Sequence, residues 1–562
     1  MTAKEISLFI PGPSPKLAMS ILVALSIPFI FLGIDQYGVV GTDEAFYQDI
    51  ALGMLESGNF LELRSGGAIY VYDTFANAPL QYWARSAIAA VLGKSMLSMR
   101  ILSALSALLT VLATYRLVLT IGGRSAAFAS GLVLLTSFQF LYLHSARTGE
   151  LEPSVCLLLV CCALLFIRII RNTGESPGRW WVHHLLVAIL FNLKAPTAFL
   201  PLAAEVLAFC LIPGARSHFF PWLKSGLIAL PFALAWHGYQ ALQYPEQVRS
   251  VLLAVGHQAT GDFAAGPGGG LAGRALYYGQ KLLFGSFPYV LLFPLAIYGA
   301  ARAAAEKATR PDGQGDALRV LLAYLFTIVI FYLGISKVGP WYIVHAYPFL
   351  AALLGLYLSG LRSSQKQKAP IELLGIALAL SLLFWLAPEI AGYNPFATDA
   401  YVIPMTTHWR AVPGLSTGLG VALLAALVLG ALAAGMRAMS AQFPGGLALL
   451  LFLLFVGYGA TRSLAPLAHI DHLSPAAALD ADLGARVAAG SPIPFPVDVP
   501  STHPWVVNYY FYRDFDLRIS DGEDRPAFRK PTRYTLLGWR PGRSPESSTP
   551  IFGSRADGGR AR

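Results

Sequence analysis

Long apolar runs separated by short polar stretches dominate the first 461 residues of the chain. A helix that crosses a lipid bilayer needs about 20 predominantly apolar residues. By this criterion the candidate spans are 17–34, 98–121, 125–143, 153–170, 180–193, 196–212, 225–242, 283–301, 319–335, 341–361, 371–388, 413–436 and 444–461. The pattern predicts a polytopic α-helical membrane protein with about 13 transmembrane helices.

Two polar loops between the spans are long. The first, 35–97, predicts two helices: 44–55 has helical spacing of its apolar residues, and 79–92 is amphipathic with aromatic residues that suit a membrane interface. The second, 243–282, is broken by a glycine-rich run that is typical of a flexible turn. Both loops fall on the same predicted side of the membrane.

The chain changes character after residue 465. Charged residues and prolines become more frequent, and no further span follows. A helix is expected at 479–489 and strands at 506–512, 517–520 and 534–539. We therefore expect three parts: a transmembrane domain over 1–465, a small α/β domain outside the membrane over 466–541, and a disordered tail over 542–562.

Composition supports lipid as the solvent of this chain. Hydrophobic residues make up 55% of the sequence and charged residues 13%, whereas soluble proteins carry about 25% charge. The net charge of +10 does not predict a nucleic-acid partner, because basic loops on the cytoplasmic side explain it in a membrane protein. All 4 cysteines lie in apolar runs, so neither a structural disulfide nor a cysteine metal site is expected.

Lysine and arginine are unevenly shared between the two sets of loops. Loops on the side of the N-terminus hold Arg116, Arg124, Arg168, Arg171, Arg179, Arg216, Lys224, Arg362, Lys366, Lys368 and Arg437. The short loops on the other side hold Arg147, Lys194 and Lys337. The positive-inside rule then predicts a multi-pass protein of the plasma (inner) membrane, with its N-terminus in the cytoplasm and its C-terminus outside.

Acidic and basic residues meet at the outward ends of the spans. They are Asp43, Glu44, Arg147, Glu150, Glu152, Lys194 and Lys337. Each alone is commonly a solvated helix cap or a snorkelling anchor, but together they suit one reaction. A carboxylate can orient or deprotonate an acceptor hydroxyl, while lysines hold a lipid phosphate and stabilise its charge as a sugar leaves it. No nucleotide-binding loop is present.

Five short motifs carry a resemblance to a known family. In order they are Gly41–Tyr47, Ala78–Trp83, Ala146–Pro153, Leu193–Pro196 and Ser336–Tyr342. Their order, spacing and sidedness from about residue 17 to 360 resemble the GT-C glycosyltransferases. The branch that they are most similar to holds the lipid A aminoarabinose transferases and the polyprenyl-phosphate-mannose protein mannosyltransferases.

The resemblance implies roles for individual residues. Asp43 matches the acid that acts on or positions the acceptor, and Glu152 matches a second acidic position that is usually Asp. Lys194 matches the lysine that contacts the lipid phosphate, and Lys337 with Tyr342 matches a further pair on the phosphate side. The implied activity is transfer of a hexosyl or pentosyl group from a polyprenyl-phosphate donor to a lipid, glycan or protein acceptor on the extracytoplasmic face.

At some motif positions the resemblance does not assign a role to the residue. Glu44 is expected to be catalytic and Arg147 to bind substrate, yet each matches a motif position whose role the family does not fix. Ala76 and Asn77 stand where the family often has Glu-Lys before its Pro-Pro-Leu stretch. Because that acid is linked to the aminosugar in aminoarabinose transferases, its absence puts an aminosugar donor in question.

The sequence leaves alternatives open for the cofactor and for the class of function. Hard ligands for a divalent metal are available in Asp43, Glu150 and Glu152 with His257 or His345, but no spacing requires a metal. A transporter or lipid flippase is the main alternative to an enzyme, and a scaffold protein is the other. Transporters place ionisable residues near mid-membrane in paired repeats, whereas here these residues lie at span ends and no internal repeat is found.

Overall fold

The computed structural model of this chain describes a large part of the sequence. The described residues are 13–35, 42–65, 68–69, 78–142, 144–171, 178–246, 248–250, 252–253, 270–286, 289–306, 313–335, 338–361, 456–457, 534–540 and 549–554. Lys337 and His257 lie outside them, as do the expected spans at 371–388 and 413–436 and all of the expected span at 444–461 except 456–457.

Helices make up almost all of the described part before residue 362. They are α1 (Pro15–Ser26), the π-helical turn η1 (Ile27–Phe31), α2 (Thr42–Ser57), α3 (Leu80–Leu92), α4 (Met96–Leu135), α5 (Phe138–Tyr142), α6 (Glu152–Arg171), α7 (Gly178–Phe191), α8 (Phe199–Leu211), α9 (Phe219–Gln243), α11 (Gly270–Gly285), α12 (Phe293–Glu306), α13 (Gln314–Gly334) and α14 (Tyr347–Leu361). Short 3₁₀ turns connect some of them: η2 (Ala195–Ala198), η3 (Pro213–His218), η4 (Tyr289–Leu292) and η5 (Tyr342–Ala346).

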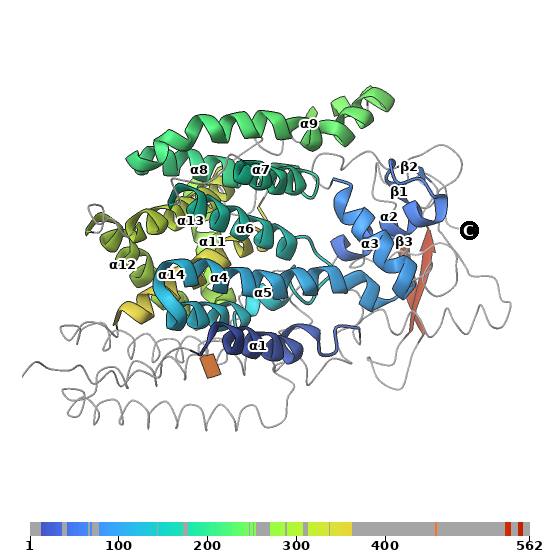
Figure 1. Cartoon of the computed structure of the whole chain (residues 1–562). Coiled ribbons are helices and arrows are strands. Elements are labelled where there is room, and N and C mark those ends of the chain that lie inside the picture. The colour runs from blue at the N-terminus through green and yellow to red at the C-terminus, as the bar shows by residue number, and fades with distance from the viewer. Residues whose placement is uncertain are drawn as a thin grey trace, which may run out of the picture.

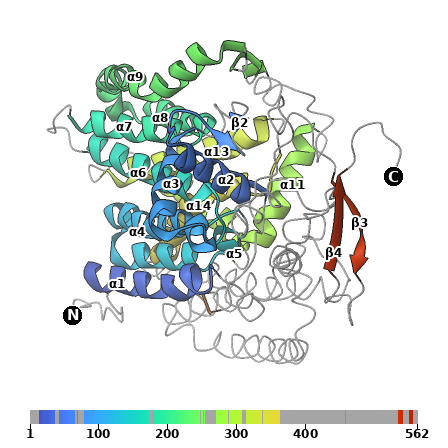
Figure 2. The same ribbon diagram turned by 90° about the vertical axis from the view of Figure 1, so that its right-hand side faces the viewer.

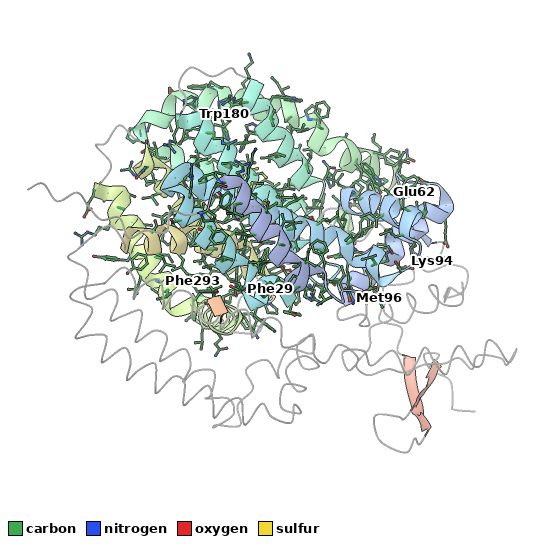
Figure 3. All side chains as sticks on the ribbon, turned by 60° about the horizontal axis from the view of Figure 1, so that its bottom comes forward. Phe29, Glu62, Lys94, Met96, Trp180 and Phe293 are labelled. Atoms are coloured by element: carbon green, nitrogen blue, oxygen red, sulfur yellow. The ribbon has the colours of Figure 1, made fainter. Side chains whose placement is uncertain are left out.

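The long helices run side by side and leave one end of the bundle capped. Helix α9 follows one edge of the bundle and α1 the opposite edge, while α2 and α3 lie beyond the ends of the long helices (Figure 1). Figure 2 looks onto that end and shows α2 and α3 in front of the bundle. Glu62, Lys94 and Met96 lie at this same end (Figure 3). The cap therefore covers the loops that precede α6 and follow α7.

Length and hydropathy confirm that the chain is a polytopic helical membrane protein. Within the described residues, 5 helical segments are long and apolar enough to cross a membrane: Met96–Leu135, Glu152–Arg171, Pro213–Gln243, Gln314–Gly334 and Tyr342–Ser359. Two shorter apolar segments are Pro15–Phe31 and Ala195–Leu211. The total of about 13 spans stays a prediction, because the last part of the transmembrane domain lies outside the described residues.

The two helices expected in the first long loop are present. The predicted segments 44–55 and 79–92 correspond to α2 and α3. The predicted span 98–121 and the first part of the predicted span 125–143 are joined in α4, and the rest of 125–143 contains the separate short helix α5. Helix α4 is broken at Gly123, where φ is 84°. Only glycine adopts this backbone region at little cost, so the sequence itself fixes the position of the break.

Four strands are described, in two antiparallel pairs. Strand β1 (Arg64–Ser65) pairs with β2 (Ala68–Ile69), and β3 (Tyr534–Arg540) pairs with β4 (Thr549–Ser554). Strand β3 coincides with the strand expected at 534–539, while β4 falls within the tail that we expected to be disordered. The expected helix at 479–489 and the strands at 506–512 and 517–520 lie outside the described residues.

Close approach of helix backbones holds the centre of the bundle together. At Gly355 of α14, an added Cβ would lie 2.5 Å from the carbonyl oxygen of Ala126 in α4. At Gly122 of α4, it would lie 2.1 Å from a side-chain carbon of Leu356. Small residues at such contacts allow the dense packing on which membrane helices depend.

Candidate active site

The neighbouring acids Asp43 and Glu44 take different environments in the first turn of α2. Consecutive residues of an α-helix point about 100° apart. Asp43 remains partly exposed, whereas Glu44 is 0% exposed. Only Asp43 of the two therefore faces a space that a substrate can reach.

Glu44 holds three segments of the chain together. Its carboxylate accepts hydrogen bonds from Nε and Nη2 of Arg100 at 3.1 and 2.9 Å, and from the backbone N–H of Gly149 at 2.7 Å. Arg100 also donates to the carbonyl of Ile34 at 2.8 Å. These charge-assisted bonds connect the start of α2 to α4 and to the 144–151 loop.

Two further buried arginines fix the same loop. Arg85 of α3 donates to the carbonyls of Met99 and Gly149, each at 2.6 Å. Arg147 donates to carbonyls of residues 29, 30 and 32, at and just after η1, over distances of 2.6 to 3.3 Å. The predicted substrate-binding residue Arg147 thus anchors the loop to the end of the first span, and Gly149 is held through both its N–H and its carbonyl.

An ion pair joins the buried Glu152 to the partly exposed Lys194. Glu152 is the first residue of α6, Lys194 precedes η2, and their Oε1 and Nζ atoms are 2.8 Å apart. The Lys194 ammonium also lies 5.4 Å from the ring centroid of Tyr342. Burial alone would lower the pKa of Lys194, but the carboxylate of Glu152 outweighs it and raises the pKa above its ordinary value. The lysine therefore stays charged.

Beside this pair, Asp43, His144 and Glu150 form a second cluster. One potential ligand atom from each lies within 4.8 Å of the others. Nδ1 of His144 is 3.3 Å from Oε2 of Glu150, and the His144 ring stacks on Trp341 with centroids 4.1 Å apart. The sequence analysis named Asp43 and Glu150 but missed His144. Its position in the same short loop as Glu150 was the available signal.

The charges of this cluster are strongly coupled. Burial raises the pKa of Glu150 to about 7, and the negative charges of Asp43 and Glu152 act in the same direction. Burial would lower the pKa of His144, but attraction to Glu150, Asp43 and Glu152 raises it to about 9. The charge of Asp43 also acts on Lys194, so the two clusters belong to one site.

His345, one of the two histidines that the sequence offered as a metal ligand, is not part of the cluster of Asp43, His144 and Glu150. It is 0% exposed, and its Nδ1 is 2.5 Å from the hydroxyl of Tyr332. Tyr332 in turn stacks on Tyr342 with centroids 5.1 Å apart. Within the described residues, the group of possible metal ligands contains His144 and neither His345 nor Glu152.

One acid lies deep among the helices, away from the end that α2 and α3 cap. Glu205 of α8 accepts hydrogen bonds from Tyr324 at 2.6 Å and from the indole of Trp222 at 2.7 Å, and it pairs with Nε2 of His183 at 2.7 Å. The sequence analysis did not single it out. Both of its oxygens are satisfied by protein groups, so it acts as a packing hub rather than as an open ion site.

Comparison with known proteins places this geometry in a family context. Residues 76–237 match the family described as dolichyl-phosphate-mannose-protein mannosyltransferase. An uncharacterized protein of Aquifex aeolicus is 24% identical over 371 residues, which are 66% of this chain and 69% of that protein.

Solved structures resemble most of the chain. The structure of ArnT from Cupriavidus metallidurans bound to undecaprenyl phosphate has a TM-score of 0.65 and 18% identity, covering 89% of this chain and 84% of that one. The apo form of the same protein gives 0.63 and 19%, with the same coverage. The expected GT-C fold is thereby confirmed.

Proposed function

We propose that this chain, a membrane protein with the GT-C fold, is a glycosyltransferase that moves a sugar from a polyprenyl-phosphate donor to an acceptor on the extracytoplasmic face. The observation that carries the proposal is the outward site itself. A partly exposed acid, Asp43, lies within electrostatic reach of the ion pair of Lys194 and Glu152. An acid for a hydroxyl and a cation for a phosphate are the two groups that this transfer requires.

Lys194 is suited to a phosphate that gains charge. An ammonium has three N–H donors, of which one reaches Glu152 at 2.8 Å. The remaining donors are available to phosphate oxygens while Glu152 keeps the side chain in place. The ring of Tyr342 lies beside the ammonium and strengthens its placement through a cation–π contact. We assign Lys337 to the same phosphate on the family resemblance alone.

Asp43 is assigned to the acceptor. It lies in the first turn of α2, where the helix N-terminus interacts favourably with a carboxylate. An ionised acid can accept the proton of an attacking hydroxyl or orient it. As the sugar–phosphate bond breaks, the hydroxyl oxygen forms the new bond to the sugar carbon, and the phosphate leaves with the electron pair.

Glu44 and Arg147 have positioning roles in this proposal. The carboxylate of Glu44 and the terminal nitrogens of Arg147 make ion-pair or backbone contacts that fix the 144–151 loop. Glu152 has a mixed role, because it sets the position of Lys194 and contributes negative charge to the site. Donor sugar class, hexose or pentose, and acceptor class, lipid, glycan or protein, are the next questions for the same site.

The comparisons support a polyprenyl-phosphate donor, but they do not test the roles proposed for individual residues. The ArnT structure carries undecaprenyl phosphate by its own description, and the matched family is described by a dolichyl-phosphate sugar. Both are polyprenyl phosphates. Among the residues that the structure describes, Glu205 does not favour the transporter or flippase alternative, since protein groups occupy both oxygens of this buried acid.

Binding of undecaprenyl phosphate by the full chain in lipid nanodiscs tests the phosphate assignment. Lys194→Met removes the ammonium and keeps most of the side-chain volume. Loss of a hydrogen bond to a charged group costs about 1.5–3 kcal/mol, so the Kd should rise roughly 10- to 100-fold. Lys94→Met is the matched control, because Lys94 lies at the same end of the molecule (Figure 3) and pairs loosely with Glu56 at 4.0 Å. Equal binding by both variants would remove Lys194 from the phosphate site.

A further inference from the structure

We infer that Tyr332 and His345 are positioning residues for the donor phosphate, because together they hold the ring of Tyr342 beside the ammonium of Lys194. Both side chains are buried: Tyr332 is 2% exposed and His345 is 0% exposed. They therefore act on the phosphate through Tyr342 and not by direct contact. The inference rests on the proposed function, since it takes Lys194 as the group that binds the phosphate.

Stacking of two tyrosine rings is the first part of this arrangement. The rings of Tyr332 and Tyr342 lie almost parallel, with an interplanar angle of 10° and centroids 5.1 Å apart. Aromatic pairs favour offset stacking at such separations. The Lys194 ammonium lies 5.4 Å from the centroid of the Tyr342 ring, within the range of a cation–π contact. Tyr332 thus supports the ring that the ammonium contacts.

A hydrogen bond keeps the Tyr332 ring in this place. Its hydroxyl oxygen is 2.5 Å from Nδ1 of His345. The hydroxyl is the donor, because the reverse bond would leave the hydroxyl proton without an acceptor. The proton of the neutral imidazole then lies on Nε2, which has no hydrogen-bond partner among the residues that the structure describes. The bond to Tyr332 is therefore the contact that orients the His345 side chain.

Tyr342 and His345 meet Tyr332 from the same side of η5. They are three residues apart in this 3₁₀ turn, and side chains at i and i+3 of a 3₁₀ helix lie one above the other. One residue of α13 therefore contacts two residues of η5, by ring stacking and by a hydrogen bond. This double contact ties η5, and with it Tyr342, to the end of α13.

Helix α6 connects this arrangement to the ion pair. The thiol of Cys156 donates a weak hydrogen bond to the carbonyl of Val344 in η5 at 3.6 Å. Cys156 lies one turn after Glu152 in α6, and the carboxylate of Glu152 holds Lys194 at 2.8 Å. The two partners of the ammonium, Glu152 and Tyr342, are therefore placed by two segments that contact each other.

A purely structural role is the competing interpretation of the pair. Buried tyrosine and histidine side chains commonly bond to each other only to satisfy polar groups in a core. Loss of the bond would then lower the free energy of unfolding and leave donor binding unchanged. A positioning role predicts instead that donor affinity falls, and that it falls only while Tyr342 is present.

Binding of undecaprenyl phosphate by the full chain in lipid nanodiscs separates the two interpretations. His345→Leu and Tyr332→Leu should each raise the Kd about 2- to 5-fold, the range for loss of a cation–π contact near the surface, and by no more than Tyr342→Leu does. In a Tyr342→Leu background the same two substitutions should have no further effect. His345→Asn should bind like the wild type, because its amide oxygen can accept from Tyr332 in place of Nδ1.

Tyr324→Phe is the matched control. Tyr324 is also a buried tyrosine of α13, and its hydroxyl donates to Glu205 at 2.6 Å. Loss of this bond should lower the Tm without changing the Kd for undecaprenyl phosphate. A rise in Kd for Tyr324→Phe equal to that for His345→Leu would overturn the inference, since any lost hydrogen bond in α13 would then have the same effect.

The remaining outcomes separate this inference from the proposed function. An unchanged Kd in His345→Leu and Tyr332→Leu, or an equal further rise in the Tyr342→Leu background, overturns the positioning role while Lys194→Met still weakens binding. If Lys194→Met also binds like the wild type, the phosphate site itself is wrong and both proposals fail. Should Tyr332→Leu fail to fold, as judged by gel filtration, the contrast between His345→Leu and His345→Asn decides.

Discussion

Gly149 is the point at which a single methyl group should disturb the site without touching a reacting residue. An added Cβ would lie 2.9 Å from the Cβ of Glu44 and 2.9 Å from the carbonyl oxygen of Met99. Both atoms belong to or adjoin the backbone, so neither can swing aside. Gly149→Ala therefore has to move the 144–151 loop relative to α2 and α4.

The expected cost follows from the two bonds that this movement strains. Gly149 donates its N–H to Glu44 at 2.7 Å and accepts from Arg85 at 2.6 Å. A hydrogen bond to a charged group contributes about 1.5–3 kcal/mol. Loss of both would cost roughly 3–6 kcal/mol, and about half of that if the shifted loop keeps one. Because the loop leads into Glu152, a shift of about 1 Å should also slow transfer by about 10²-fold.

Thermal unfolding of the protein in nanodiscs, followed by tryptophan fluorescence, measures the stability effect. Gly149→Ala should unfold several degrees below the wild type. Gly238→Ala in α9 is the matched control, since an added Cβ there meets nothing within 4 Å. That helix position should gain up to about 1 kcal/mol from alanine. A Gly149→Ala protein that unfolds and works like the wild type would refute the role given to Glu44 and Arg85.

Substitutions at four other positions test the remaining assignments. Asp43→Asn should fold normally and lower the transfer rate by about 10²–10⁴, measured as sugar released from a polyprenyl-phosphate donor; near-normal transfer would exclude Asp43 from the mechanism. Lys194→Arg keeps the charge but replaces a compact ammonium with a planar fork, so donor binding should weaken in the nanodisc assay, whereas an anchoring lysine would tolerate it. Tyr342→Phe should retain donor affinity and Tyr342→Leu should lose a few-fold, because the cation–π contact requires only the ring; equal affinities would dismiss that contact. Glu205→Gln should lower the free energy of unfolding by about 2 kcal/mol, because one of the side chains that hydrogen-bond Glu205 would then face an amide N–H. Binding of undecaprenyl phosphate should stay unchanged, and a loss of that binding would instead support a transport role for Glu205.

Local signals in the sequence were enough to place the helices that cap the site. Helix α2 starts at Thr42 and α3 at Leu80, directly after Pro79, and residues of these types mark helix starts. The break at Gly123 lies between two predicted spans, because glycine adopts the backbone angles of the break at little cost. Each of these features depends on residues that are neighbours in the chain.

Sequence reasoning could not separate the roles of Asp43 and Glu44. Both occupy the first turn of α2, and the rotation of that helix is set by the pairing of Glu44 with Arg100, 56 positions away. His144 was missed for a similar reason, since it lies in a loop and its significance arises from Asp43, about 100 positions earlier in the chain. Long-range ion pairs of this kind leave no periodic trace in the sequence.

The pairing of Lys194 with Glu152 also changes what the sequence implied. The resemblance assigned Lys194 to the lipid phosphate and Glu152 to a second acidic position, as separate groups. Their 2.8 Å contact makes them one unit, in which the acid holds the lysine ready for a phosphate. A longer acid than the usual aspartate at this position reaches the ammonium directly.

The most direct test of the central claim is mass spectrometry of the polyprenyl-phosphate pool and of lipid A, surface glycans and secreted proteins, with and without this chain. Deletion should cause one sugar-loaded polyprenyl phosphate to accumulate and should remove that sugar from one class of acceptor. Wild-type protein should restore both, and Asp43→Asn should restore neither despite normal expression. An unchanged pool and unchanged acceptors, together with altered uptake of a solute or altered lipid distribution between leaflets, would contradict a glycosyltransferase and indicate a transporter or flippase.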